Sequence, residues 1–132
     1  MRRLVLLAGA SSALLAGCGG ASSYHLAATR ACLAKAKGVK LSHRVDFIAS
    51  TASAGAFTVK FARDQVTFAR NQVTISFGRD SAEAAQLAKG YRRVHGKNIG
   101  IEDVLRPQHN AVMLWVAHPS DAQLGTVTGC LK

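Results

Sequence analysis

Residues 56–77, AFTVKFARDQVTFARNQVTISF, decide the fold class of this chain. In residues 56–61 and again in residues 72–77, apolar side chains alternate with mostly polar ones. A period of two with one polar face is typical of antiparallel strands that are covered on one side. Residues 66–68 are a shorter strand candidate between them. The pattern therefore predicts an antiparallel sheet.

Three helices are predicted to accompany these strands. Residues 80–95, DSAEAAQLAKGYRRVH, carry an apolar stripe at helical spacing, and residues 24–37 are rich in Ala and Lys, which favour helix. Residues 119–123 open the last helix, because Ser120 and Gln123 have the spacing of a capping box.

The other segments are assigned by their polarity. Residues 39–44 and 101–106 are expected to be extended, whereas residues 48–55 are rich in small and polar side chains and are expected to form a loop. Residues 111–117 are apolar on both faces, so we place this strand centrally, with Trp115 partly covered.

The composition fits one globular domain. The chain has 132 residues, of which 48% are hydrophobic and 18% are charged, which excludes a disordered chain and favours one domain over two. We predict an α+β fold over residues 24–132 with the order α-β-β-β-α-β-β-α. Its antiparallel sheet has four to five strands, and its helices pack mainly on one face.

The first residues have the features of an export signal. Arg2 and Arg3 precede an apolar stretch from Leu4 to Ala16, which spans roughly 20 Å as a helix and is shorter than the ~30 Å hydrocarbon core of a bilayer. No apolar run in the sequence reaches the ~18 residues of a membrane-spanning helix. A cleaved signal peptide over residues 1–17 fits better than a buried N-terminal helix.

The end of this stretch, Leu15-Ala16-Gly17-Cys18, resembles the lipobox of bacterial lipoproteins. In that family the Cys thiol is acylated and the leader is cut just before it. The resemblance therefore implies that Cys18 anchors the mature chain to the extracytoplasmic side of the cell membrane. Residues 18–23 would then be the lipidated Cys and a short flexible linker. The alternative is cleavage nearby and a freely secreted product.

The chain contains three cysteines, an odd number. If Cys18 takes lipid, Cys32 and Cys130 are left in an oxidising compartment, where two thiols tend to bridge. Each lies at the edge of an apolar stripe on a predicted helix, and two such helices side by side would bring the sulfurs together. We predict a disulfide between them. Neither Cys lies in a CxxC or a nucleophile motif, which disfavours a catalytic Cys32.

Motifs for catalysis and metal binding are missing from the sequence. The five His have no HxH, HxxxH or HExxH spacing, and there is no nucleotide-binding, EF-hand or GxSxG motif. The acidic residues are assigned to helix starts, loops and opposite faces of a strand. We therefore expect no metal, no cofactor and no enzyme activity.

The chain carries an excess of positive charge. The chain has 17 Lys and Arg against 7 Asp and Glu. On the outer side of a membrane such an excess favours anionic lipid headgroups or wall polymers, whereas in the cytosol it would indicate nucleic acid. The candidate binding residues are Lys35, Lys37, Lys40, Lys89, Arg92, Arg93 and Lys97. A generally basic, solvated surface is the alternative interpretation.

These observations predict a lipid-anchored envelope protein with a binding or structural role and a basic surface that faces anionic lipid or cell-wall polymer. Two alternatives stay open. One is a small envelope hydrolase that uses Cys32 or a Ser with one of the His. The other is an accessory subunit of an envelope complex, which an exposed apolar patch beside Trp115 or the strand of Phe57 would favour.

Overall fold

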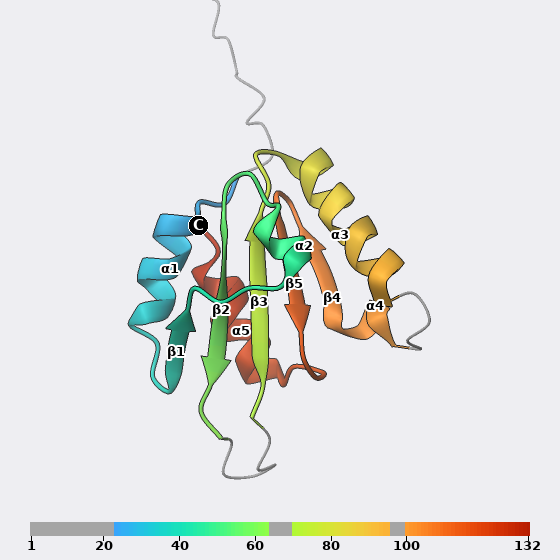
Figure 1. Ribbon diagram of the computed structural model, residues 1–132. Coiled ribbons are helices and arrows are strands. Elements are labelled where there is room, and N and C mark those ends of the chain that lie inside the picture. Colours follow the sequence, from blue (N-terminus) through green and yellow to red (C-terminus); the bar gives the residue numbers. More distant parts are fainter. Residues whose placement is uncertain (1–22, 64–69, 96–99) are drawn as a thin grey trace, which may run out of the picture.

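The computed structural model describes residues 23–63, 70–95 and 100–132. Within them, a five-stranded antiparallel sheet carries helices on both faces (Figure 1), which confirms the α+β class. The elements in chain order are α1 (Leu26–Ala34), β1 (Val39–Ser42), α2 (Phe47–Ser50), β2 (Ala56–Phe61), β3 (Gln72–Phe77), α3 (Ser81–His95), α4 (Ile101–Val104), β4 (Leu105–Gln108), β5 (Ala111–Trp115) and α5 (Asp121–Cys130).

The strand order in the sheet is β1-β2-β3-β5-β4, with β3 at the centre and β5 beside it. Thr74 of β3 lies opposite Thr58 of β2 and Leu114 of β5. The predicted order α-β-β-β-α-β-β-α holds when the two four-residue helices are set aside. Its first strand is β1; the strand candidate at 66–68 lies outside the described residues.

The face of the sheet beneath α1 and α5 is closed. Val73, Ile75 and Phe77 of β3 are each 0% exposed and pack with Leu33 of α1 in one hydrophobic core. Trp115 is 2% exposed, so the expectation that it is partly covered is wrong. The indole ring lies in this core and stacks on Phe61, with the ring centroids 5.7 Å apart.

The predicted disulfide is confirmed. It joins Cys32 of α1 to Cys130 of α5, with the two Cα atoms 5.4 Å apart. The backbone N–H of His25 donates to the carbonyl of Lys132, so the two ends of the domain are also held together by hydrogen bonding. The capping box at Ser120, which begins α5, is formed as predicted.

The opposite face is covered by α2 and α3, so the helices divide between the two faces, whereas we expected most of them on one. The reason lies in β5, whose Val112 packs against Leu87 and Tyr91 of α3, and against Leu105 of β4. A strand that is apolar on both faces requires a covering layer on each side.

Two short helices replace segments that we expected to be irregular or extended. The segment at 48–55 begins within α2, because the Asp46 side chain accepts a hydrogen bond from the Ala49 N–H and caps the helix. The segment at 101–106 begins as the helical turn α4, and the strand starts only at Leu105. None of the described helices is long and apolar enough to cross a lipid bilayer.

Candidate functional site

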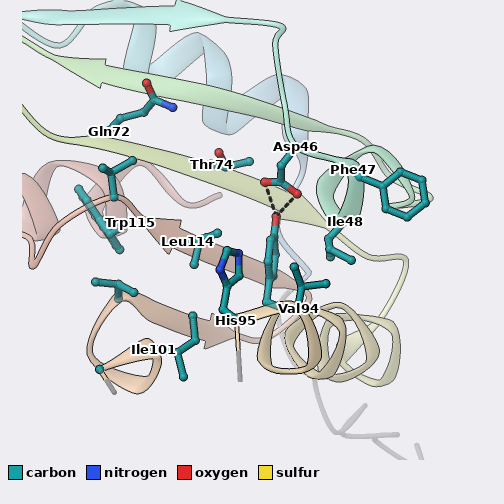
Figure 2. Close-up of a pocket in the computed structure, with 14 residues that line it drawn as sticks. Asp46, Phe47, Ile48, Gln72, Thr74, Val94, His95, Ile101, Leu114 and Trp115 are labelled. Carbon is teal, nitrogen blue, oxygen red and sulfur yellow. Dashed lines mark hydrogen bonds between the residues drawn. The ribbon is translucent and has the colours of Figure 1, made fainter. Parts of the chain in front are cut away.

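A cavity of about 730 Å³ lies on the α3 side of the sheet, between α2, the end of α3 and α4. We call it the apolar cavity. Its floor includes Thr74 of β3 and Leu114 of β5, and its walls include Ile48, Val94 and Ile101 (Figure 2). The volume falls within the range of roughly 300–1,000 Å³ that is usual for small-molecule sites.

The rim of the apolar cavity is hydrophobic and exposed. Phe47 is 80% exposed, Val94 65% and Val116 70%, and these are the large hydrophobic side chains that stand exposed in the described part of the chain. All three line the same cavity. Single exposed apolar side chains are ordinary, but several around one opening indicate a binding surface.

A hydrogen-bonded pair joins the two walls of the apolar cavity. The Tyr91 hydroxyl donates to the Asp46 carboxylate, with oxygen–oxygen distances of 2.8 and 3.0 Å (dashed lines in Figure 2). Burial, and then the hydrogen bond and the charge of Asp46, raise the pKa of Tyr91 well above its usual value. The phenol is therefore neutral at physiological pH and acts as a fixed donor. Because Asp46 also caps α2, the pair fixes α2 to α3.

A second cavity of about 730 Å³ adjoins the first. We call it the basic cavity, because Lys40, Lys60, Arg63 and Arg70 line it and no acidic residue among those described does so. Gln72 and Val116 line both cavities.

The structure does not gather the predicted basic residues on one surface. Lys35, Lys37 and Lys40 lie near the end of α1 and in β1, whereas Lys89, Arg92 and Arg93 lie on α3. These two groups sit at opposite edges of the sheet (Figure 1), since α1 packs beside β1 and α3 over β4. Arg92 is paired with Glu102, with its Nε 2.6 Å from a carboxylate oxygen, and Lys97 lies outside the described residues.

Of the six predicted basic residues that lie in the described ranges, Lys40 alone lines the basic cavity. Sequence reasoning missed Lys60, Arg63 and Arg70, because they are scattered along the chain and meet only through strand pairing. It also missed Phe47, Asp46 and Tyr91 as site residues. The strand-pairing register of residues 56–61 is the signal that could have found Lys60.

Cys32, the candidate nucleophile of the hydrolase alternative, has its sulfur in the disulfide with Cys130. Two His side chains engage local partners: His118 lies 2.8 Å from Asp103, and His43 lies 2.8 Å from the Arg30 guanidinium. In the described ranges, no group of three or more His, Cys, Asp or Glu is arranged to hold a metal ion.

Comparison with known proteins gives no family for this chain. No protein-family model matches it. No curated protein and no solved structure matches it either. Its function must therefore be argued from the two cavities.

Proposed function

We propose that this protein is a lipid-anchored, extracytoplasmic binding module without enzyme activity, which holds a small and largely apolar ligand in the apolar cavity. The observation that carries the proposal is the exposed rim of Phe47, Val94 and Val116 around a cavity of about 730 Å³. A ligand that covers these side chains removes apolar surface from water, which is worth about 25 cal/mol for each Å².

The polar groups of the apolar cavity support binding rather than turnover. Tyr91 is held neutral and its proton is directed at Asp46, so it is poorly placed to act as a base. Asp46 already accepts hydrogen bonds from Tyr91 and from the Ala49 N–H. Together with Thr74 and Gln72 they supply a few polar contacts on an apolar wall, the arrangement that orients a bound molecule.

The anchor is supported by the lipobox-like sequence that ends at Cys18 and by the disulfide. A disulfide that joins the two ends of a domain is typical of proteins that leave the cytosol. Replacement of Cys18 by Ser tests the anchor in the full chain. We expect it to abolish incorporation of a labelled fatty acid and to move the protein out of the membrane fraction. Unchanged labelling would contradict lipidation at Cys18.

A neutral fluorescent probe, N-phenyl-1-naphthylamine, tests the cavity in the full chain. We expect its fluorescence to rise on binding and Phe47→Ser with Val94→Ser to weaken binding about tenfold, because about 1.4 kcal/mol of apolar contact is lost. Ala85→Ser is the matched control, since Ala85 is exposed on α3 and does not line the cavity. Equal binding by both variants would overturn the assignment of the site.

A second candidate, the accessory subunit of an envelope complex, is favoured by one observation. Val116 follows the buried Trp115 and is 70% exposed, and with Phe47 and Val94 it forms an apolar patch that a partner protein would cover. A photo-crosslinking amino acid at position 116 tests this candidate in living cells. One adduct of discrete protein mass would favour the subunit role, and its absence would favour the small ligand.

A further inference from the structure

The basic cavity brings like charges together at a cost to the fold. Lys40 of β1 and Lys60 of β2 are direct cross-strand partners, and like charges in that position repel and destabilise a sheet. Arg63 and Arg70 line the same cavity, and no acidic residue of the described ranges enters it. Repulsion of this kind is relieved when an anion occupies the space between the cations.

The basic cavity and the apolar cavity lie side by side, because they share two lining residues. Gln72, the first residue of β3, lines both of them, and so does Val116, which follows β5. One molecule that extends across Gln72 and Val116 would contact the cations at one end and the apolar walls at the other.

The negative and positive side chains lie at opposite ends of the two adjoining cavities. Figure 2 shows Gln72 and Trp115 at one end of the apolar cavity and Asp46 and Phe47 at the other. The basic cavity begins at Gln72. The carboxylate of Asp46 therefore lies at the end of the apolar cavity that is farther from the basic cavity. An anionic group is repelled from the Asp46 end and attracted towards Lys40 and Lys60, so only one orientation of a charged ligand is favoured.

We infer that the ligand is an amphipathic anion, with its hydrocarbon chain in the apolar cavity and its phosphate or carboxylate head in the basic cavity. This inference rests on the proposed function and names the ligand class of that site. It assigns a role to the charge of β1 and β2 and to the exposed rim at the same time, whereas a purely apolar ligand leaves Lys40 and Lys60 without one.

Trp115 provides the measurement, because it is the one tryptophan of the chain. Its indole packs in the closed core, and the residue also borders the apolar cavity. Its fluorescence would be titrated with decyl phosphate, decanol and decyltrimethylammonium below their micelle concentrations. The protein is the full chain with Cys18→Ser and the disulfide closed. We expect decyl phosphate to bind at least tenfold more tightly than decanol, with decyltrimethylammonium the weakest.

The charge variants separate the basic cavity from the overall charge. Lys40→Gln with Lys60→Gln should remove the preference for phosphate, and relief of the cross-strand repulsion favours correct folding. Lys35→Gln with Lys37→Gln removes the same net charge from residues that do not line either cavity, and should retain the preference. Loss of the preference in both pairs would mean a diffuse field and overturn the inference.

The remaining outcomes distinguish the inference from the proposed function. Equal affinity for decyl phosphate and decanol overturns the inference and leaves the apolar site standing. Binding of none of the three amphiphiles overturns both. If Trp115 responds both to decyl phosphate and to phosphatidylglycerol vesicles, the anionic head belongs to a membrane lipid. If it responds to decyl phosphate alone, the head belongs to a free amphiphile. Both results support the inference.

Discussion

The two faces of the central strand β3 differ in how completely they are covered. Val73, Ile75 and Phe77 are each 0% exposed beneath α1 and α5. On the opposite face, Gln72 and Thr74 line the apolar cavity between α2 and α3. Alternate residues of the same six-residue strand therefore serve a closed core and an open site.

This difference assigns stability to one face of the sheet and the proposed binding to the other. The closed face has the larger hydrophobic core and the disulfide. The open face keeps large apolar side chains in water and a pair of opposed lysines, both of which cost stability. A small domain has only about 5–15 kcal/mol of stability in total. The packing and the disulfide of the closed face must therefore offset the destabilisation on the open face.

The largest expected effect on stability comes from removing the disulfide of the closed face. Cys32→Ala with Cys130→Ala opens a loop that spans a sequence separation of 98 residues. We expect the free energy of unfolding to fall by about 4–5 kcal/mol, measured by urea denaturation of the full chain. Reduction of the unsubstituted protein is the control and should give a similar loss. If the free energy of unfolding fell by less than about 1 kcal/mol, packing rather than the disulfide would stabilise the closed face.

Adjacent residues of β5 compare the two faces directly. Met113 is 1% exposed in the closed core, whereas Leu114 lines the apolar cavity. We expect Met113→Ala to lower the free energy of unfolding by about 3 kcal/mol and Leu114→Ala by about 1–2 kcal/mol, because the second truncation enlarges an existing cavity and creates no new one. Equal losses in denaturant titrations would contradict the difference between the faces.

Tyr91→Phe should have a smaller effect, because it removes one hydrogen bond to a charged group on the open face. We expect a loss of about 1–2 kcal/mol in the free energy of unfolding at pH 7. Binding of N-phenyl-1-naphthylamine should weaken as well, since α2 is no longer fixed to α3. Unchanged binding would mean that the walls hold their separation without this pair.

The raised pKa of Tyr91 also predicts that the free energy of unfolding depends on pH in the alkaline range. Burial and Asp46 raise the pKa of Tyr91 above its unfolded value of 10.0. The unfolded state therefore loses the proton first, and the contribution to stability is complete below pH 10 and declines as the pH rises beyond it. Urea titrations at pH 8 and 10.5 should show this decline, and Tyr91→Phe should reduce its slope.

The smallest effect is expected at Glu83, at the start of α3. Its carboxylate accepts hydrogen bonds from Ser53 and from the Arg79 N–H, and these lower the pKa of Glu83. Its contribution is present above the usual pKa near 4.5 and is lost as the pH falls through the lowered value. Glu83→Gln should thus destabilise slightly at pH 7, and the difference in the urea midpoint should vanish in strong acid.

Local periodicity explains why much of the fold follows from the sequence. Residues 56–61, 72–77 and 80–95 form the strands and the helix that their patterns predict, and the phasing of Cys32 and Cys130 places both sulfurs between α1 and α5. The expected polar outer face of the two strands is wrong, since Thr58, Thr74 and Ser76 are buried. The division of the helices between two faces was not predicted. The apolar outer face of 111–117 was noticed, but no pattern states which helix covers it.

The site was harder to predict because it depends on contacts between distant residues. Asp46 and Tyr91 are 45 positions apart, and Tyr91 has the spacing of an ordinary core residue on its helix. Lys40 and Lys60 become neighbours only through the register of β1 and β2. Charge clustering in the sequence instead indicated Lys89 and Arg93, which lie on α3 at the opposite edge of the sheet from β1 and the basic cavity.

The two ends of the domain are hydrogen-bonded together at one end of β3. Tyr24 is bound to Asn110, which in turn holds Gly78 just beyond the end of β3, and His25 is bound to Lys132 beside them. The two cavities meet at Gln72, at the other end of β3, roughly 17 Å away. If Cys18 carries the proposed lipid, a tether joined at Tyr24 would place both cavities at the end of the domain that lies farther from the bilayer.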